Sequence, residues 1–129
     1  MPRIVMAALA LAALVCTDGC AARRTLERSA PFVHVVLFKT RAGGPEAAAG
    51  IVRDIRTMLE PLPTVRGLWI GRPAPTNDRP IVDVNYDVGL MILFEDQKGL
   101  QEYLDHPVHA EFARKHDTRC DVRVFDIVR

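Results

Sequence analysis

The segment YLDHPVHAEF, residues 103–112, holds the densest group of side chains that could do chemistry. It places Tyr103, Asp105, His106 and His109 within seven positions. A tyrosine beside a histidine can form an acid–base pair, in which the imidazole takes a proton and the phenol donates to a developing oxyanion. Two histidines three residues apart could instead begin a metal site, but the sequence fixes no third ligand, so we predict no metal.

Pro107 divides this segment into two parts. Proline favours the first position of a helix and keeps the preceding residue out of the helical region, so His106 should lie at a helix start. His109 then lies one turn inside the new helix, on the apolar face that it shares with Phe112. Tyr103 belongs to the preceding helix. We therefore expect Tyr103 and His109 to converge on a cavity, while His106 shapes the junction.

His34 is the third candidate, because it lies in FVHVVLFK, a predicted strand at 32–39, on the face that also carries Val36 and Phe38. A hydrogen-bonded core histidine and a packed tyrosine are the structural alternatives for His34 and Tyr103. We predict Tyr103 and His109 as catalytic candidates. The other predicted residues of a pocket between helices and sheet are His34, Val36, Val88 and Phe112.

Strands and helices alternate along the rest of the chain. Further strands are predicted at 65–71, 86–95 and 121–129, and helices at 45–60, 96–106 and 107–116. The order βαββαβ indicates a ferredoxin-like α+β sandwich. Helices cover one face of such a sheet, yet strands 32–39 and 86–95 are apolar on both faces. A second copy of the sheet would cover the other face, which predicts a homodimer that closes into an α/β barrel.

Composition excludes several functions. The chain has 129 residues and a formal net charge of +1, and it has no basic run, so we expect no nucleic-acid partner. No GxSxG, HExxH, P-loop or dinucleotide fingerprint is present, so we expect no cofactor. Cys120 is the one cysteine of the predicted domain, and we interpret it as structural.

The first 31 residues differ from the rest. Arg3 precedes twelve apolar residues at 4–15, which are typical of a secretory signal and are too few for a permanent membrane span. Gly19-Cys20 resembles the end of a bacterial lipobox, although cleavage a few residues later is the alternative. We predict a signal peptide at 1–20, lipidation at Cys20, a linker at 21–31 and a domain at 32–129. The protein would be exported to the bacterial cell envelope, touching the membrane only through this anchor.

Five segments together resemble the stress-responsive dimeric A/B barrel (Dabb) family. They are HVVLFK at 34–39, VRGLWIG at 65–71, RPIVDVNYDVGLMILF at 79–94, YLDHPVHAEF at 103–112 and VRVFD at 122–126. The resemblance implies a ferredoxin-like monomer that forms a dimeric barrel. One plant member is a polyketide cyclase that needs no cofactor. Its catalytic tyrosine and histidine fall on Tyr103 and His109, and its first-strand histidine falls on His34. Its third-strand pocket histidine falls near Val88, so it is absent from this chain.

Three functions are consistent with these patterns. The leading expectation is a homodimer that binds a small apolar or aromatic molecule. The alternatives are an acid–base enzyme of the cyclase, lyase or isomerase type that uses Tyr103 and His109, and a non-catalytic structural or stress-related dimer. An open cavity would favour the first two, and a sealed interior would favour the third.

Overall fold

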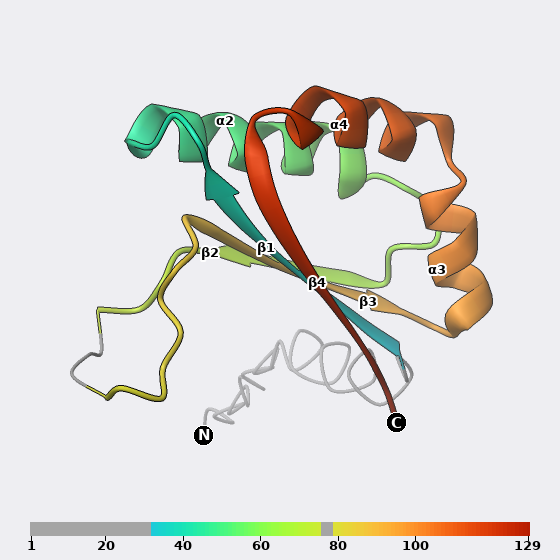
Figure 1. Cartoon of the computed structure of the whole chain (residues 1–129). Helices are drawn as coiled ribbons and strands as arrows, with labels where there is room; N and C mark the ends of the chain where they lie inside the picture. Colours follow the sequence, from blue (N-terminus) through green and yellow to red (C-terminus); the bar gives the residue numbers. More distant parts are fainter. Residues whose placement is uncertain (1–31, 76–78) are drawn as a thin grey trace, which may run out of the picture.

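The computed structural model describes residues 32–75 and 79–129 (Figure 1). The predicted signal peptide, linker and lipidation site at Cys20 lie outside these residues. The elements follow the predicted βαββαβ order, with a short π-helical turn after the first helix. They are β1 (Phe32–Thr40), α2 (Pro45–Asp54), η1 (Ile55–Leu59), β2 (Gly67–Gly71), β3 (Val88–Phe94), α3 (Gln97–Leu104), α4 (Pro107–Asp117) and β4 (Cys120–Val128).

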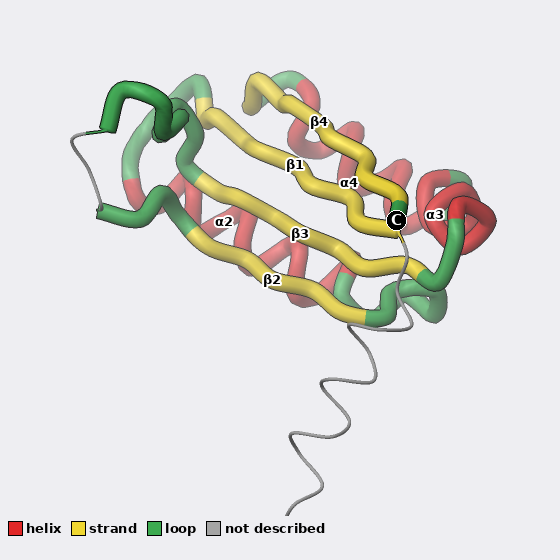
Figure 2. Tube along the Cα trace, turned by 90° about the horizontal axis from the view of Figure 1, so that it is seen from below, coloured by secondary structure: helices red, strands yellow, loops and turns green. Residues whose placement is uncertain are grey.

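The four strands form one antiparallel sheet in the order β2-β3-β1-β4. All the helices lie on one face of this sheet, and the other face has no helix of the described residues over it (Figure 2). This arrangement confirms the predicted ferredoxin-like α+β sandwich. In the described ranges, no helix is long and apolar enough to cross a membrane.

Strand β1 is central because both of its faces are apolar. Its alternate residues are buried towards the helices, and the residues between them are half-buried on the open face. In the sheet register, His34 lies opposite Ile92 of β3 and Asp126 of β4. The site described below is therefore anchored at the middle of the sheet, and its outer wall is the edge strand β4.

The first helix differs from the prediction of one continuous α-helix that ends before Pro61. The α-helical part stops at Asp54, and the Glu60 N–H donates to the Ile55 carbonyl, an i to i+5 bond of 2.9 Å. The Thr57 hydroxyl donates to the Arg53 carbonyl at 2.9 Å. A side chain that occupies a helix carbonyl in this way competes with the backbone ladder and favours such a local widening.

Side chains cap the starts of α3 and α4. The Asp96 carboxylate accepts from the Gly99 N–H at 2.8 Å, which caps α3. His106 is extended, with Pro107 at the first position of α4, and its Nδ1 accepts from the Val108 N–H at 3.2 Å. Pro107 thus separates the two helices as the sequence predicted, and His106 is the cap of α4.

Candidate functional site

A cavity of about 550 Å³ lies between the helix layer and β4. Its wall on the β4 side is unusual, because Val122 and Val124 face the helix layer and are still 43% and 50% exposed. Helix α4 does not cover these two side chains, and so a mouth remains open along the sheet edge. Residues of β1, β3, β4, α3, α4 and η1 line the cavity. They include His34, Val36, Phe38, Leu90, Tyr103, Leu104, His109, Phe112, Ala113, Arg114, His116, Asp117, Val122, Val124 and Asp126.

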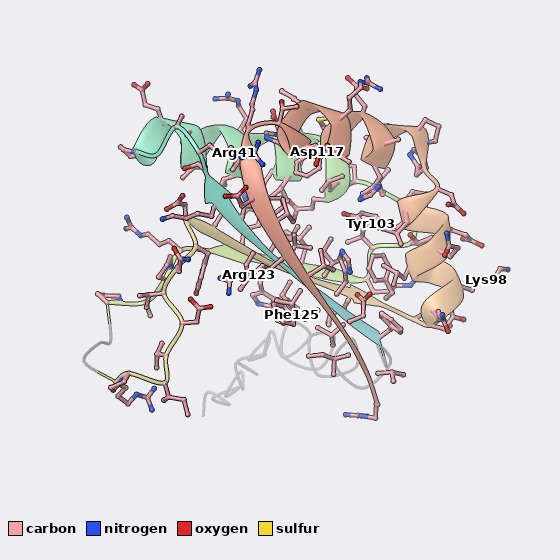
Figure 3. The ribbon with its side chains drawn as sticks, in the orientation of Figure 1. Arg41, Lys98, Tyr103, Asp117, Arg123 and Phe125 are labelled. Carbon is pink, nitrogen blue, oxygen red and sulfur yellow. The ribbon has the colours of Figure 1, made fainter. Side chains whose placement is uncertain are left out.

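Tyr103 comes from the buried side of α3 and points towards the sheet (Figure 3). Its ring packs among three other aromatic rings, with centroid distances of 4.6 Å to His109, 5.1 Å to Phe94 and 6.1 Å to His34. Burial raises the pKa of Tyr103 well above its ordinary value, so the side chain stays a phenol at neutral pH. Its hydroxyl has no hydrogen-bond partner among the described residues and can donate to a ligand.

His109 is held in one tautomer by the end of α3. Its Nδ1 lies 3.1 Å from the carbonyl of Leu104, the last residue of that helix. A carbonyl can only accept, so Nδ1 carries the proton and Nε2 keeps its lone pair when the ring is neutral. Burial lowers the pKa of His109, which the hydrogen bond to Leu104 opposes and the nearby His34 reinforces. The neutral ring therefore presents Nε2 as a base.

His34 has a partner that sequence reasoning missed. Its Nδ1 donates to the carboxylate of Asp126 at 2.6 Å, across the β1–β4 ladder. His34 is buried, while Asp126 is half-exposed at the cavity mouth. The signal in the sequence was an aspartate on the helix-facing side of a predicted strand. Only the pairing of β4 with β1 shows that this aspartate meets His34.

The structure brings five of the six predicted residues to one cavity and leaves out the sixth. His34, Val36, Tyr103, His109 and Phe112 all line it. Val88 does not, and that expectation was wrong. Val88 pairs with Phe38 but lies on β3, on the side of β1 away from β4, where it is buried and lines another hollow, between α2 and the β2–β3 end of the sheet. Leu90 is the residue of β3 that lines the cavity.

Two buried polar residues of the site region were not singled out from the sequence. They are Asp54, the last residue of α2, and His116, in the last turn of α4. The Asp54 Oδ2 accepts from His116 Nε2 at 2.9 Å and from Lys115 Nζ at 2.7 Å. Burial acts to raise the pKa of Asp54, but these two donors outweigh it and lower the pKa. A helical periodicity cannot show this pairing, because the partners are 62 residues apart.

The polar side chains of the site are suited to acid–base chemistry. Within residues 32–75 and 79–129, no three His, Cys, Asp or Glu side chains are placed to hold a metal ion. A phenol that can donate, an imidazole that can accept a proton and a histidine–aspartate pair face one partly apolar space. Such a set can bind a small molecule and can move a proton on it.

Solved structures with the same fold show low identity to this chain. A Dabb-family protein with a ferredoxin-like fold from Mesorhizobium loti is 24% identical, with a TM-score of 0.63, covering 76% of this chain and 95% of its own. A dimeric ferredoxin-like protein of unknown function from Thermobifida fusca is 16% identical, with a TM-score of 0.62, covering 76% and 90%. A hydroxynitrile lyase from Passiflora edulis is 14% identical, with a TM-score of 0.64, covering 76% and 92%.

The family itself follows from the sequence match. No curated protein matches this chain. The family model of the stress-responsive A/B barrel domain matches residues 32–129, which include every strand and helix described above and the whole cavity. The chain therefore belongs to the stress-responsive A/B barrel (Dabb) domain family.

Proposed function

We propose that this protein binds a small apolar or aromatic molecule in the cavity between α4 and β4. The observation that carries the proposal is a pair of polar atoms, the Tyr103 hydroxyl and His109 Nε2, that face an open and partly apolar cavity. Neither atom has a hydrogen-bond partner among the described residues. Neither atom is among the buried unsatisfied groups of the described ranges, so both are open to the cavity, where a ligand can accept from the hydroxyl and donate to Nε2.

The size and lining of the cavity support the ligand class. Its volume of about 550 Å³ lies within the range of small-molecule sites. The rings of Tyr103, His109 and Phe112 supply aromatic surface, and Val36 and Leu90 supply aliphatic surface. A ligand with one aromatic ring and one or two oxygen atoms would match these groups.

Ala113→Phe tests the proposal, because Ala113 is an exposed residue of α4 at the cavity lining. The larger side chain narrows the entrance without changing the core. The control is Ala110→Phe, which makes the same change at an exposed position of the same helix that does not line the cavity. With a panel of hydroxylated aromatic compounds in a thermal-shift assay, we expect stabilisation of the wild type and of Ala110→Phe. We expect Ala113→Phe to weaken binding at least about tenfold, since overpacking costs ~1–3 kcal/mol. Equal binding of the compounds by Ala113→Phe and Ala110→Phe would exclude this cavity as the binding site.

The second candidate function is acid–base catalysis without a cofactor. The observation in its favour is the hydrogen bond from His109 to the Leu104 carbonyl, which leaves Nε2 unprotonated beside a phenol with a raised pKa. A base next to a hydrogen-bond donor can remove a proton from carbon and stabilise the resulting enolate. The hydroxynitrile lyase of Passiflora edulis has the same fold, which is compatible with such chemistry on this scaffold.

Deuterium exchange distinguishes this candidate from simple binding. An aromatic ketone that binds is incubated in deuterated buffer, and uptake at its acidic carbon is followed by NMR. We expect His109→Gln and Tyr103→Phe to slow the exchange by about 10²-fold or more while the ketone still binds. His106→Asn is the matched control, since asparagine keeps the cap of α4. If a ketone that binds exchanges no faster with the protein than in buffer alone, the catalytic candidate is rejected and only ligand binding remains.

We further propose that the active form is a homodimer. Apolar side chains cover the sheet face that the helices leave open, and three of them are well exposed: Trp69, Phe125 and Ile127. Phe125 lies on the side of the sheet away from the helices (Figure 3). An exposed apolar face of this kind typically marks an interface. The related structure from Thermobifida fusca is described as dimeric.

Export to the cell envelope, with lipid at Cys20, is also proposed. It rests on the apolar run at 4–15 and on Gly19-Cys20. Mass spectrometry of the protein from bacterial membranes tests it. A diacylglycerol adduct on Cys20 would support the lipid anchor, and a mature chain that begins after Cys20 would refute it.

A further inference from the structure

A second cavity, of about 570 Å³, lies at the end of the sheet where β1 ends and β4 begins. It is bounded by α2 on one side and by the last turn of α4 on the other. Figure 3 places Arg41 at this end, away from Tyr103. The cavity is lined by Thr40, Arg41, Ala42, Glu46, Ala47, Gly50, Ile51, Arg53, Asp54, Lys115, His116, Thr118, Arg119 and Cys120. We call it the basic cavity, because three arginines and a lysine line it.

The buried polar residues of the fold concentrate at this cavity. Four polar or charged residues are buried in the described ranges: His34, Thr40, Asp54 and His116. Three of these four line the basic cavity, and the fourth, His34, lines the cavity of the proposed site. These side chains are hydrogen-bonded, Asp54 to His116 and Thr40 to Asp87. They give the basic cavity a polar wall whose geometry is fixed.

The charge of the lining is positive. Arg41, Arg53, Lys115 and Arg119 supply four cations and Glu46 and Asp54 supply two anions, which leaves an excess of +2. The whole chain carries only +1, so this excess is local. The carboxylate of Asp54 is already neutralised, because Lys115 and His116 both donate to it. It therefore does not repel an anion as an unpaired carboxylate would.

The three arginines of the basic cavity differ in their hydrogen-bond and ion-pair partners. Arg41 is held in place, donating to the Asp121 carboxylate at 2.9 Å and to the Thr118 carbonyl at 3.1 Å. The guanidinium groups of Arg53 and Arg119 make no ion pair within residues 32–75 and 79–129. Guanidinium groups prefer oxyanions, which they bind through two parallel hydrogen bonds. Arg53 and Arg119 both line this cavity, so two guanidinium groups without an ion pair in the described ranges could bind an oxyanion there.

We propose that the basic cavity is a second binding site, for a small organic molecule that carries a carboxylate or a phosphate group. Arg53 and Arg119 bind the oxyanion, and the apolar body of the molecule lies against Ile51 and Ala47. The cavity is larger than an inorganic anion needs, which favours an organic ligand. The site is separate from the Tyr103–His109 cavity, although both share His116 in their walls.

Isothermal titration calorimetry with three probes tests the proposal. Benzoate and phenyl phosphate carry the two oxyanions, and benzyl alcohol is the neutral comparison. We expect at least one of the two anions to bind the wild type in the micromolar to millimolar range, and more weakly as salt increases. Benzyl alcohol fits the Tyr103–His109 cavity, so any binding of it should be insensitive to salt and unchanged by the substitution of Arg53 and Arg119. The double variant Arg53→Gln/Arg119→Gln should weaken binding of that anion at least about tenfold, since hydrogen bonds to charged groups are lost.

Two controls make the result specific. Arg56→Gln removes an exposed arginine three positions along the same segment, one that pairs with Glu60 and does not line the cavity, and it should bind the anion as the wild type does. Ala113→Phe narrows the Tyr103–His109 cavity and should leave the salt-dependent binding of the anion unchanged. The two cavities are therefore tested by different variants, and one proposal can fail while the other holds. The proposal is overturned if neither anion binds, or if the double variant binds as tightly as Arg56→Gln. Circular dichroism of the variants checks that they fold.

Discussion

Phe125→Asp should dissociate the proposed dimer while leaving each protomer folded. Phe125 lies on the open face of β4, opposite Val35 of β1, and 49% of its surface is exposed. Because a phenylalanine side chain buries roughly 200 Å² when fully covered, about 100 Å² remains for a partner to bury. At ~25 cal/mol per Å², the loss is about 2.5 kcal/mol for each copy. Two-fold symmetry places the substitution on both sides of the interface, so the total is about 5 kcal/mol.

This free energy corresponds to a rise of the dimer dissociation constant by roughly 10³- to 10⁴-fold. Sedimentation velocity over a thousandfold range of protein concentration measures it. The control is Val128→Asp, which introduces the same charge on the same strand but on the helix-facing side, at a residue that is 70% exposed. The reasoning is refuted if Phe125→Asp changes the dissociation constant by less than about tenfold, or if the wild type is monomeric at every concentration. Circular dichroism should show native helix and strand content in both variants.

Three further predictions concern stability, measured by urea unfolding. Asp54→Ala should cost about 1–3 kcal/mol at pH 7, because it leaves His116 without its acceptor. The pKa of Asp54 is lowered in the folded state, so the difference in unfolding free energy between the wild type and Asp54→Ala should be complete above about pH 5. It should fade as the pH falls through the lowered pKa. An equal difference at pH 3 would refute this account. Asp96→Ala should cost about 1 kcal/mol through the lost cap, and Asp96→Ser should restore most of it. Gly44→Ala should destabilise the protein by ~1–3 kcal/mol, because Gly44 has a φ of 86° that alanine adopts only with strain. Gly50 lies inside α2, where glycine is less stable than alanine, so Gly50→Ala should stabilise the protein by about 0.5–1 kcal/mol. Effects of the same sign for both substitutions would contradict this reasoning.

Local patterns were sufficient to predict the elements and their order. Pro107 predicted the break between α3 and α4, because proline imposes the same restriction in any fold. The alternation of apolar residues in β1 is equally local, since it depends on residues within a few positions of one another. The π-helical turn at 55–59 was not predicted, because the spacing of apolar residues does not distinguish an i to i+5 backbone bond from an i to i+4 bond.

By itself, the sequence determined that Tyr103 and His109 would face the layer between helices and sheet, because each lies on the apolar face of an amphipathic helix and such a face must be buried. Both faces of β1 are apolar, so only the tertiary structure decided that His34 faces the helices. Tertiary structure alone decided the pairings: Asp126 with His34 through the β1–β4 register, and Asp54 with His116 and Lys115 between the two long helical segments. It also decided that Val88 lies outside the cavity, because the strand order puts β3 on the side of β1 away from β4, next to α2. These pairings join residues 62 and 92 positions apart, and periodicity carries no information over such separations.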